Sequence, residues 1–140
     1  MAIWRTPLSL EALKDRNRHT FCEHLSIEFT EIGEDYLKAT MPVDHRVHQA
    51  IGIMNGGASC ALAETVGSNA ANYVVDIKTH YCVGLDINTN HLRPVREGLV
   101  TATARPFHLG RTTQVWGIEI HDQQGKLVSV TRLTMAVIAR

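Results

Sequence analysis

The sequence predicts an α+β fold in a single domain, residues 1–140, and three observations lead to that prediction. Apolar and polar residues alternate along several short segments, which is the periodicity of β-strands. Only one segment, from Gly57 to about Val75, is long enough and rich enough in Ala, Leu and Val to be a buried helix. No linker, repeat or low-complexity stretch divides the 140 residues, a length that suits one domain.

The first third of the chain predicts a short helix and a hairpin. Ser9 precedes an acid and good helix formers, so a helix is expected over residues 9–14. Residues 25–30 alternate apolar and polar, and residues 37–41 repeat that pattern after a turn at 33–35. Two such runs around a turn predict paired strands.

The central segment predicts the one long helix. Its length of about 18 residues argues against a buried strand. Gly56 and Gly57 stand where the chain turns sharply into the helix. Gly67 lies inside the helix and costs about 1 kcal/mol relative to Ala, so we expect another group to approach closely there.

The second half predicts four strands. On the first of them, one face is expected to carry Val83, Leu85, Ile87, Thr89 and His91. The other three are expected over residues 100–107, 113–121 and 127–138. A single helix covers one face of such a mostly antiparallel sheet, so we expect a second copy of the chain to cover the remaining face or edge.

Composition excludes several classes of function. With 14 basic and 14 acidic residues the net charge is zero, so nothing indicates binding to nucleic acid or to an anionic membrane. No apolar stretch is long enough to span a membrane, and no signal-peptide core is present. Cys22, Cys60 and Cys82 lack the spacing of a disulfide framework or zinc site, which favours reduced thiols in the cytoplasm.

The most informative residue is Glu64. Between Val47 and Val75 it is the only charged side chain, with His counted as neutral. Burial of an unpaired carboxylate costs free energy, so it is either kept for chemistry or bonded to a neighbour at an interface. Upstream, Gly56 and Gly57 open the helix, where free N–H groups favour a negatively charged oxygen; the alternative is that they serve only a tight turn.

The run from Gln49 to Ser68 resembles the signature of hotdog-fold thioesterases. More narrowly, the chain resembles the Arthrobacter-type 4-hydroxybenzoyl-CoA thioesterase clade. Within it, the chain is similar to the bacterial thioesterases that hydrolyse 1,4-dihydroxy-2-naphthoyl-CoA or proofread the enterobactin aryl carrier protein. Further matching blocks are residues 41–44, 83–93, 108–110, 114–116 and 132–134.

The resemblance implies a hotdog fold, in which a six-stranded mostly antiparallel sheet wraps around one long central helix. It also implies subunits paired into a continuous sheet, and two such dimers joined as a homotetramer. Active sites would lie at the dimer interface, with Glu64 of one subunit facing the Gly56–Gly57 turn of its partner.

The resemblance also assigns chemistry. The substrate would be an acyl- or aryl-CoA thioester, or the same acyl group on a carrier protein; coenzyme A is then part of the substrate and no cofactor is needed. Glu64 would attack the carbonyl or activate water, and the Gly56 N–H would bind the oxyanion. Gln49 would orient the carbonyl or the water, unless it is a solvated loop residue. Ser68, four residues after Glu64, could bond the carboxylate, an aryl hydroxyl or its own helix.

Basic residues are expected to bind the phosphates of coenzyme A. By resemblance, His91 and Arg93 are the first candidates, and His108 and Arg111 are weaker ones; each is otherwise a solvated surface residue. A metal site is not expected, because His45 and His48 have no third ligand at a suitable spacing.

Asn55 departs from the family pattern, which places His before the two glycines. Asn can still donate a hydrogen bond to the carbonyl oxygen, but it carries no positive charge. Three interpretations stay open: a working enzyme with a different donor, a slow enzyme, or a residue altered to trap substrate. Two rival functions follow, a CoA-ester or carrier-protein binding module and a hotdog dehydratase; the latter lacks a His beside the central acid.

Overall fold

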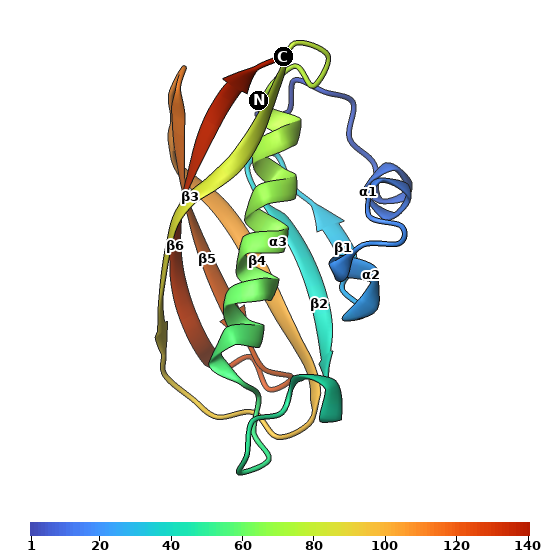
Figure 1. The fold of residues 1–140 in the computed structure, drawn as a ribbon, viewed down its shortest axis with the longest axis vertical. Coiled ribbons are helices and arrows are strands. Elements are labelled where there is room, and N and C mark those ends of the chain that lie inside the picture. Colours follow the sequence, from blue (N-terminus) through green and yellow to red (C-terminus); the bar gives the residue numbers. More distant parts are fainter.

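In the computed structural model, which describes residues 1–140, an antiparallel sheet curves around the long helix α3 (Gly56–Val74) (Figure 1). The sheet order is β1-β2-β4-β5-β6-β3, so β3 lies at the edge opposite β1. Its strands are β1 (Glu28–Ile32), β2 (Leu37–Val43), β3 (His80–His91), β4 (Gly98–Leu109), β5 (Thr113–His121) and β6 (Leu127–Ala139). The predicted α+β hotdog architecture is confirmed, with six strands around one central helix.

Shorter elements flank this core. Helix α1 (Leu10–Arg16) begins where predicted, and its N-cap Ser9 Oγ accepts a hydrogen bond from the Ala12 N–H at 3.0 Å. The one-turn helix α2 (Phe21–His24) and the 3₁₀ turn η1 (His45–Val47) were not predicted, because three or four residues are too few to show helical periodicity. None of the helices is both long and apolar enough to cross a membrane.

The core lies between α3 and the concave face of the sheet. Leu62 and Val66 of the helix are fully buried, as are Trp116, Ile118 and Leu133 of the sheet. Side chains of this size each contribute about 1.5–3 kcal/mol when buried. A β-carbon on Gly67 would lie 2.7 Å from Leu133 Cδ2, so the close approach predicted for this glycine is confirmed.

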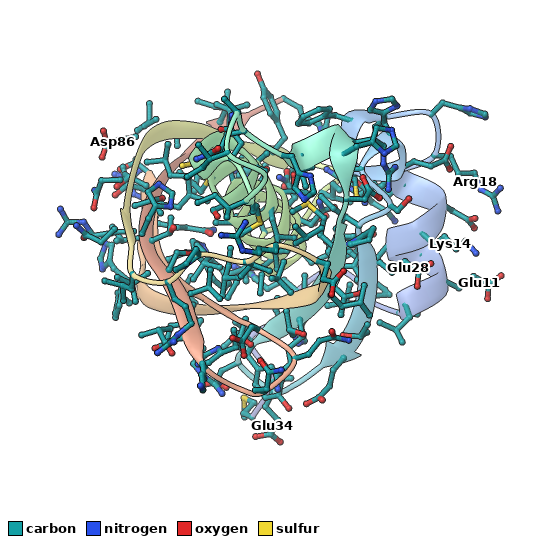
Figure 2. All side chains as sticks on the ribbon, turned by 90° about the horizontal axis from the view of Figure 1, so that it is seen from below. Glu11, Lys14, Arg18, Glu28, Glu34 and Asp86 are labelled. Carbon is teal, nitrogen blue, oxygen red and sulfur yellow. The ribbon has the colours of Figure 1, made fainter.

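Strand β3 contains a bulge that shifts its alternation. Gly84 pairs with Met135 of β6, but the next residue of β6, Thr134, pairs with Asp86, so Leu85 is the extra residue. Met135 is fully buried under α3, and Gly84 therefore faces the helix as well. Asp86 projects away from the helix on the outer side of the sheet (Figure 2).

The prediction that one face of this strand carries five residues is therefore wrong. Val83 and Leu85 are 44% and 61% exposed, whereas Thr89 reaches α3 by a contact with Cys60 and His91 by a contact with Gly56. One inserted residue moves every later side chain to the opposite face, because the strand repeat is two residues. The bulge thus decides which β3 side chains meet the helix.

Candidate active site

One face of α3 carries three of the residues that matter for the site. Gly56, Cys60 and Glu64 follow one another at intervals of four residues, which places them on the same side of the helix. All three face β3, which runs antiparallel to the helix beside it. Glu64 lies against Gly84, the Cys60 thiol is 3.4 Å from Thr89 Oγ1, and Gly56 lies against His91.

The Glu64 carboxylate has no bonded partner within the protomer. It is half-buried, forms no ion pair with any Lys, Arg or His, and is in contact with the backbone of Gly84. Ser68 lies one turn further along, and its backbone carbonyl accepts a hydrogen bond from Asn72 Nδ2. The Ser68 hydroxyl makes no hydrogen bond to Glu64. The acid is therefore free to act on a bound group.

At the start of α3, only one of the two glycine N–H groups is free. Asn55 is the N-cap, and its Oδ1 accepts a hydrogen bond from the Gly57 N–H at 2.7 Å. The Gly56 N–H donates no hydrogen bond within the chain. Since Asn55 presents its oxygen to Gly57, its Nδ2 is left free to donate a hydrogen bond.

A surface pocket of about 450 Å³ opens at this end of the helix. The structure brings four of the predicted site residues together along its walls, namely Gln49, Gly56, His91 and Arg93. Gln49 Oε1 accepts a hydrogen bond from the Ile51 N–H, which holds the side chain and leaves its amide nitrogen free to donate. Glu64 does not line this pocket.

Comparison with known proteins identifies the family of the chain. Residues 51–129, more than half of the chain, match the family described as the thioesterase superfamily. The chain belongs to the thioesterase superfamily. It is accordingly a hydrolase that acts on thioesters, and its fold is the hotdog fold of that superfamily.

Individual thioesterases are similar to this chain over nearly their whole length. A Cronobacter turicensis protein named proofreading thioesterase EntH is 46% identical over 97% of this chain and 98% of its own. An Escherichia coli protein named 1,4-dihydroxy-2-naphthoyl-CoA hydrolase is 46% identical over 97% of this chain and 99% of its own. The structure of a Pseudomonas aeruginosa thioesterase variant has a TM-score of 0.97 at 45% identity, covering 99% of this chain and 100% of that one.

Two predicted residues of this thioesterase lie elsewhere. His108 stands near the end of β4 and Arg111 in the turn that follows, where Arg111 lines a separate pocket with Arg5 and His80. That pocket is at the C-terminal end of α3, a helix of 19 residues and therefore about 27 Å long. Within one protomer, the structure does not bring His108 and Arg111 together with Arg93.

Two residues near Glu64 in the candidate site were not predicted. Gly84 was interpreted only as a strand residue, yet it provides the surface on which the Glu64 carboxylate lies. Its signal was a glycine inside a strand, which often marks a bulge or a close approach. Cys60 was interpreted only as a reduced thiol, although its position four residues before Glu64 places it on the same helix face.

Proposed function

We propose that this thioesterase hydrolyses an acyl- or aryl-CoA thioester, or the same acyl group on a carrier protein, at a site shared by two copies of the chain. Two relatives support this substrate class by their names, one as a naphthoyl-CoA hydrolase and one as a proofreading thioesterase. The reaction would occur in the cytoplasm, with coenzyme A entering as part of the substrate and no separate cofactor.

The distance between Glu64 and Gly56 along α3 is the observation that supports a site shared by two copies. Eight residues of helix place them about 12 Å apart along the axis. A nucleophile must come within about 3–3.5 Å of the carbonyl carbon. An oxyanion donor must lie about 3 Å from the oxygen on that same carbon. One protomer does not meet both conditions, so the acid and the donor of a working site come from different copies.

The edge strand β3 offers a place for the second copy. Its outer edge is unpaired, and Glu64 lies directly beneath Gly84 of this strand. A long edge with exposed Val83 and Leu85 invites pairing with another strand. Antiparallel pairing of two β3 strands would join the sheets around a twofold axis and create two equivalent sites. Two such dimers would give the expected tetramer.

The proposed chemistry follows from the groups at hand. Glu64 attacks the thioester carbonyl or takes a proton from the water that does. The Gly56 N–H and Asn55 Nδ2 of the other copy stabilise the charge that develops on the carbonyl oxygen. Gln49 Nε2 orients the carbonyl or the water, and Ser68 lies one turn beyond the acid, toward the acyl group. The carbon–sulfur bond breaks, and the products are a free acid and a thiol.

Arginine side chains would bind the phosphates of coenzyme A. Arg93 stands at the pocket that contains Gly56, and its forked donors suit phosphate. His108 and Arg111 lie too far away in the same protomer, so they would bind a coenzyme A only if another copy brings them to it.

The test is hydrolysis of a panel of aryl- and fatty-acyl-CoA substrates, followed by thiol release. The wild-type protein should release thiol, and Glu64→Gln should lose turnover while it still binds substrate. Glu119→Gln, at an exposed glutamate of β5, is the matched control and should be unchanged. Thiol release that survives in Glu64→Gln contradicts the assigned role of Glu64.

The second candidate is a binding module for CoA esters or carrier proteins, and the observation that favours it is Asn55 in the position of the family His. Binding of a CoA ester without turnover in wild type, Glu64→Gln and Asn55→His alike would support the module. A gain of turnover in Asn55→His alone would indicate an enzyme slowed by that residue.

A further inference from the structure

On the basis of the proposed function, we propose that the imidazole of His91 is a further hydrogen-bond donor to the thioester carbonyl oxygen, in addition to the Gly56 N–H and Asn55 Nδ2. By resemblance, His91 was expected to bind the phosphates of coenzyme A. The position of its ring favours a role at the reacting group instead.

The His91 ring lies against Gly56. A β-carbon built on Gly56 would lie 2.9 Å from Nε2 of His91 and 3.0 Å from its Cε1. The edge of the imidazole therefore lies directly over the α-carbon of Gly56. The nitrogen that carries the free N–H of Gly56 is bonded directly to this α-carbon, so the ring and the free donor are neighbours.

The His91 side chain is available for a ligand. It takes part in no hydrogen bond or ion pair of the chain, in contrast to His48, whose Nε2 bonds the Arg96 carbonyl. Together with Gly56, it lines the pocket of about 450 Å³. A neutral imidazole with a proton on Nε2, or an imidazolium, would donate into this pocket.

The backbone fixes this arrangement. His91 pairs with Ser129 of β6 at the end of β3, and the bulge between Gly84 and Asp86 turns it toward α3. Without that extra residue, His91 would face the outer side of the sheet. Because both His91 and Gly56 belong to one protomer, their contact does not depend on how two copies pair.

A carbonyl oxygen that becomes negative is stabilised by the hydrogen-bond donors around it. Asn55 stands where the family resemblance places an imidazole, and its Oδ1 is engaged by the Gly57 N–H. His91 would supply an imidazole from β3. It keeps its proton throughout, because hydrolysis adds the hydroxyl of water to the carbonyl carbon and the remaining proton to the departing sulfur. His91 only donates a hydrogen bond to the oxygen, most strongly when that oxygen is negative.

Two thioesters with the same acyl group separate this role from phosphate binding. One carries coenzyme A, and the other carries N-acetylcysteamine, which has no nucleotide or phosphate. His91→Ala should lower kcat by about 10²-fold on both substrates, because it removes an oxyanion donor. His91→Gln, which keeps a side-chain N–H donor, should retain more activity than His91→Ala. Adding Asn55→His to His91→Ala should restore part of the lost kcat.

Arg93→Ala, two residues further along the chain, is the comparison for loss of phosphate binding, and it should raise KM for the CoA thioester far more than KM for the N-acetylcysteamine thioester. The neutral control is Glu119→Gln, at an exposed position of β5, which should keep the wild-type kcat on both substrates. If His91→Ala behaves in the same way as Arg93→Ala, or leaves kcat unchanged on both substrates, the donor role is wrong. If the wild-type protein hydrolyses neither thioester, the proposed function itself fails, and the donor role fails with it.

Discussion

The carboxylate of Glu64 lies so close to the α-carbon of Gly84 that no β-carbon fits between them. The glycine stands on the edge strand, immediately before the bulge, and Glu64 stands in the middle of α3. This contact fixes the orientation of the Glu64 side chain, because its carboxylate packs against the backbone of β3 at Gly84.

Gly84→Ala should therefore move the carboxylate and lower kcat, while the fold is retained. A displacement of about 1 Å in a catalytic group can cost on the order of 10²-fold in rate. Steady-state kinetics on a CoA thioester would measure the loss. Asn88→Ala, at an exposed position of the same strand, is the control and should keep the wild-type kcat.

A double-mutant cycle makes this prediction specific. Glu64→Asp shortens the acid by one methylene, which withdraws the carboxylate from the new methyl group. The two substitutions should be less harmful together than the sum of their separate effects, because they alter the same contact. Strictly additive losses would show that Gly84 does not position the acid.

The free N–H of Gly56 can be removed without changing the helix. Proline is well tolerated at the first position of a helix, where its missing N–H leaves no intrahelical bond unmade. Asn55 already has the extended conformation that precedes proline, with φ −63° and ψ 136°. Gly56→Pro should therefore fold and lose on the order of 10²-fold in kcat, while Gly56→Ala keeps the N–H and places a β-carbon against the same His91 ring. Equal losses in both variants would assign the effect to the ring contact instead.

Mixing two inactive variants tests whether the site is shared. Gly56→Pro and Glu64→Gln, denatured together and refolded in equal amounts, should form mixed dimers in which one of the two sites has both wild-type groups. Random pairing restores about a quarter of the wild-type activity. If both groups come from one protomer, the mixture should stay as inactive as its components.

Asn55 combines a capping oxygen with a free amide nitrogen, and two substitutions separate them. Asn55→Asp keeps an oxygen for the Gly57 N–H, so its melting temperature should match the wild type. Asn55→Ala loses the cap and should lower the free energy of unfolding by about 1 kcal/mol. Both variants lack Nδ2 and should be slower on thioesters, Asn55→Asp by the larger factor because it adds a negative charge near the developing oxyanion. Full activity in Asn55→Asp would exclude a donor role for this residue.

The sequence was sufficient to predict the elements that have clear periodicity. The long helix was expected over residues 57–75 and is observed as Gly56–Val74, because its apolar residues extend beyond the length of any ordinary strand. The family resemblance assigned Gln49, Gly56, His91 and Arg93 to different parts of the substrate, and the structure gathers all four at one pocket. Their roles stay predictions.

The sequence could not show that the side chains of β3 change faces of the sheet part-way along the strand. Alternation in β3 places Val83 and Leu85 on the face of Ile87, yet one extra residue in the pairing with β6 reverses this. A bulge is set by the partner strand, so it leaves little trace in the pattern of a single strand. The contacts of Gly84 with Glu64 and of His91 with Gly56 both depend on it.

The three thiols should differ sharply in reactivity. Burial raises the pKa of Cys82 to about 11, and burial together with the nearby Glu23 raises the pKa of Cys22 to about 11. At neutral pH their thiolate fraction is about a hundredfold below that of a thiol with a pKa of 9. Cys60 is only half-buried and should be alkylated first, as mass spectrometry after brief iodoacetamide treatment would show. Faster labelling of Cys82 than of Cys60 in the folded protein would contradict this order.

The pair formed by Asp44 and Arg46 predicts a loss of stability in acid. Arg46 donates to the carboxylate of Asp44 from its side chain at 2.9 Å and from its backbone N–H at 3.0 Å, and these bonds lower the pKa of Asp44 from 3.8 to about 2. A carboxylate whose pKa is lower in the folded state than in the unfolded state stabilises the fold at pH values above its unfolded-state pKa. That contribution is lost as the pH falls toward the folded-state pKa. Arg46 also donates to the His24 carbonyl, so the pair links η1 to α2.

The advantage of the wild-type protein over Asp44→Asn should therefore be complete above about pH 4 and should vanish between pH 3.8 and pH 2. Melting temperatures of the two proteins, measured at intervals across that range, would show two curves converging at low pH. Because both side chains are partly exposed to solvent, 1 M salt should reduce the difference at pH 6. Parallel curves from pH 6 to pH 2 would show that the charge of Asp44 does not stabilise the turn, and that only its capping oxygen, which Asn also provides, does so.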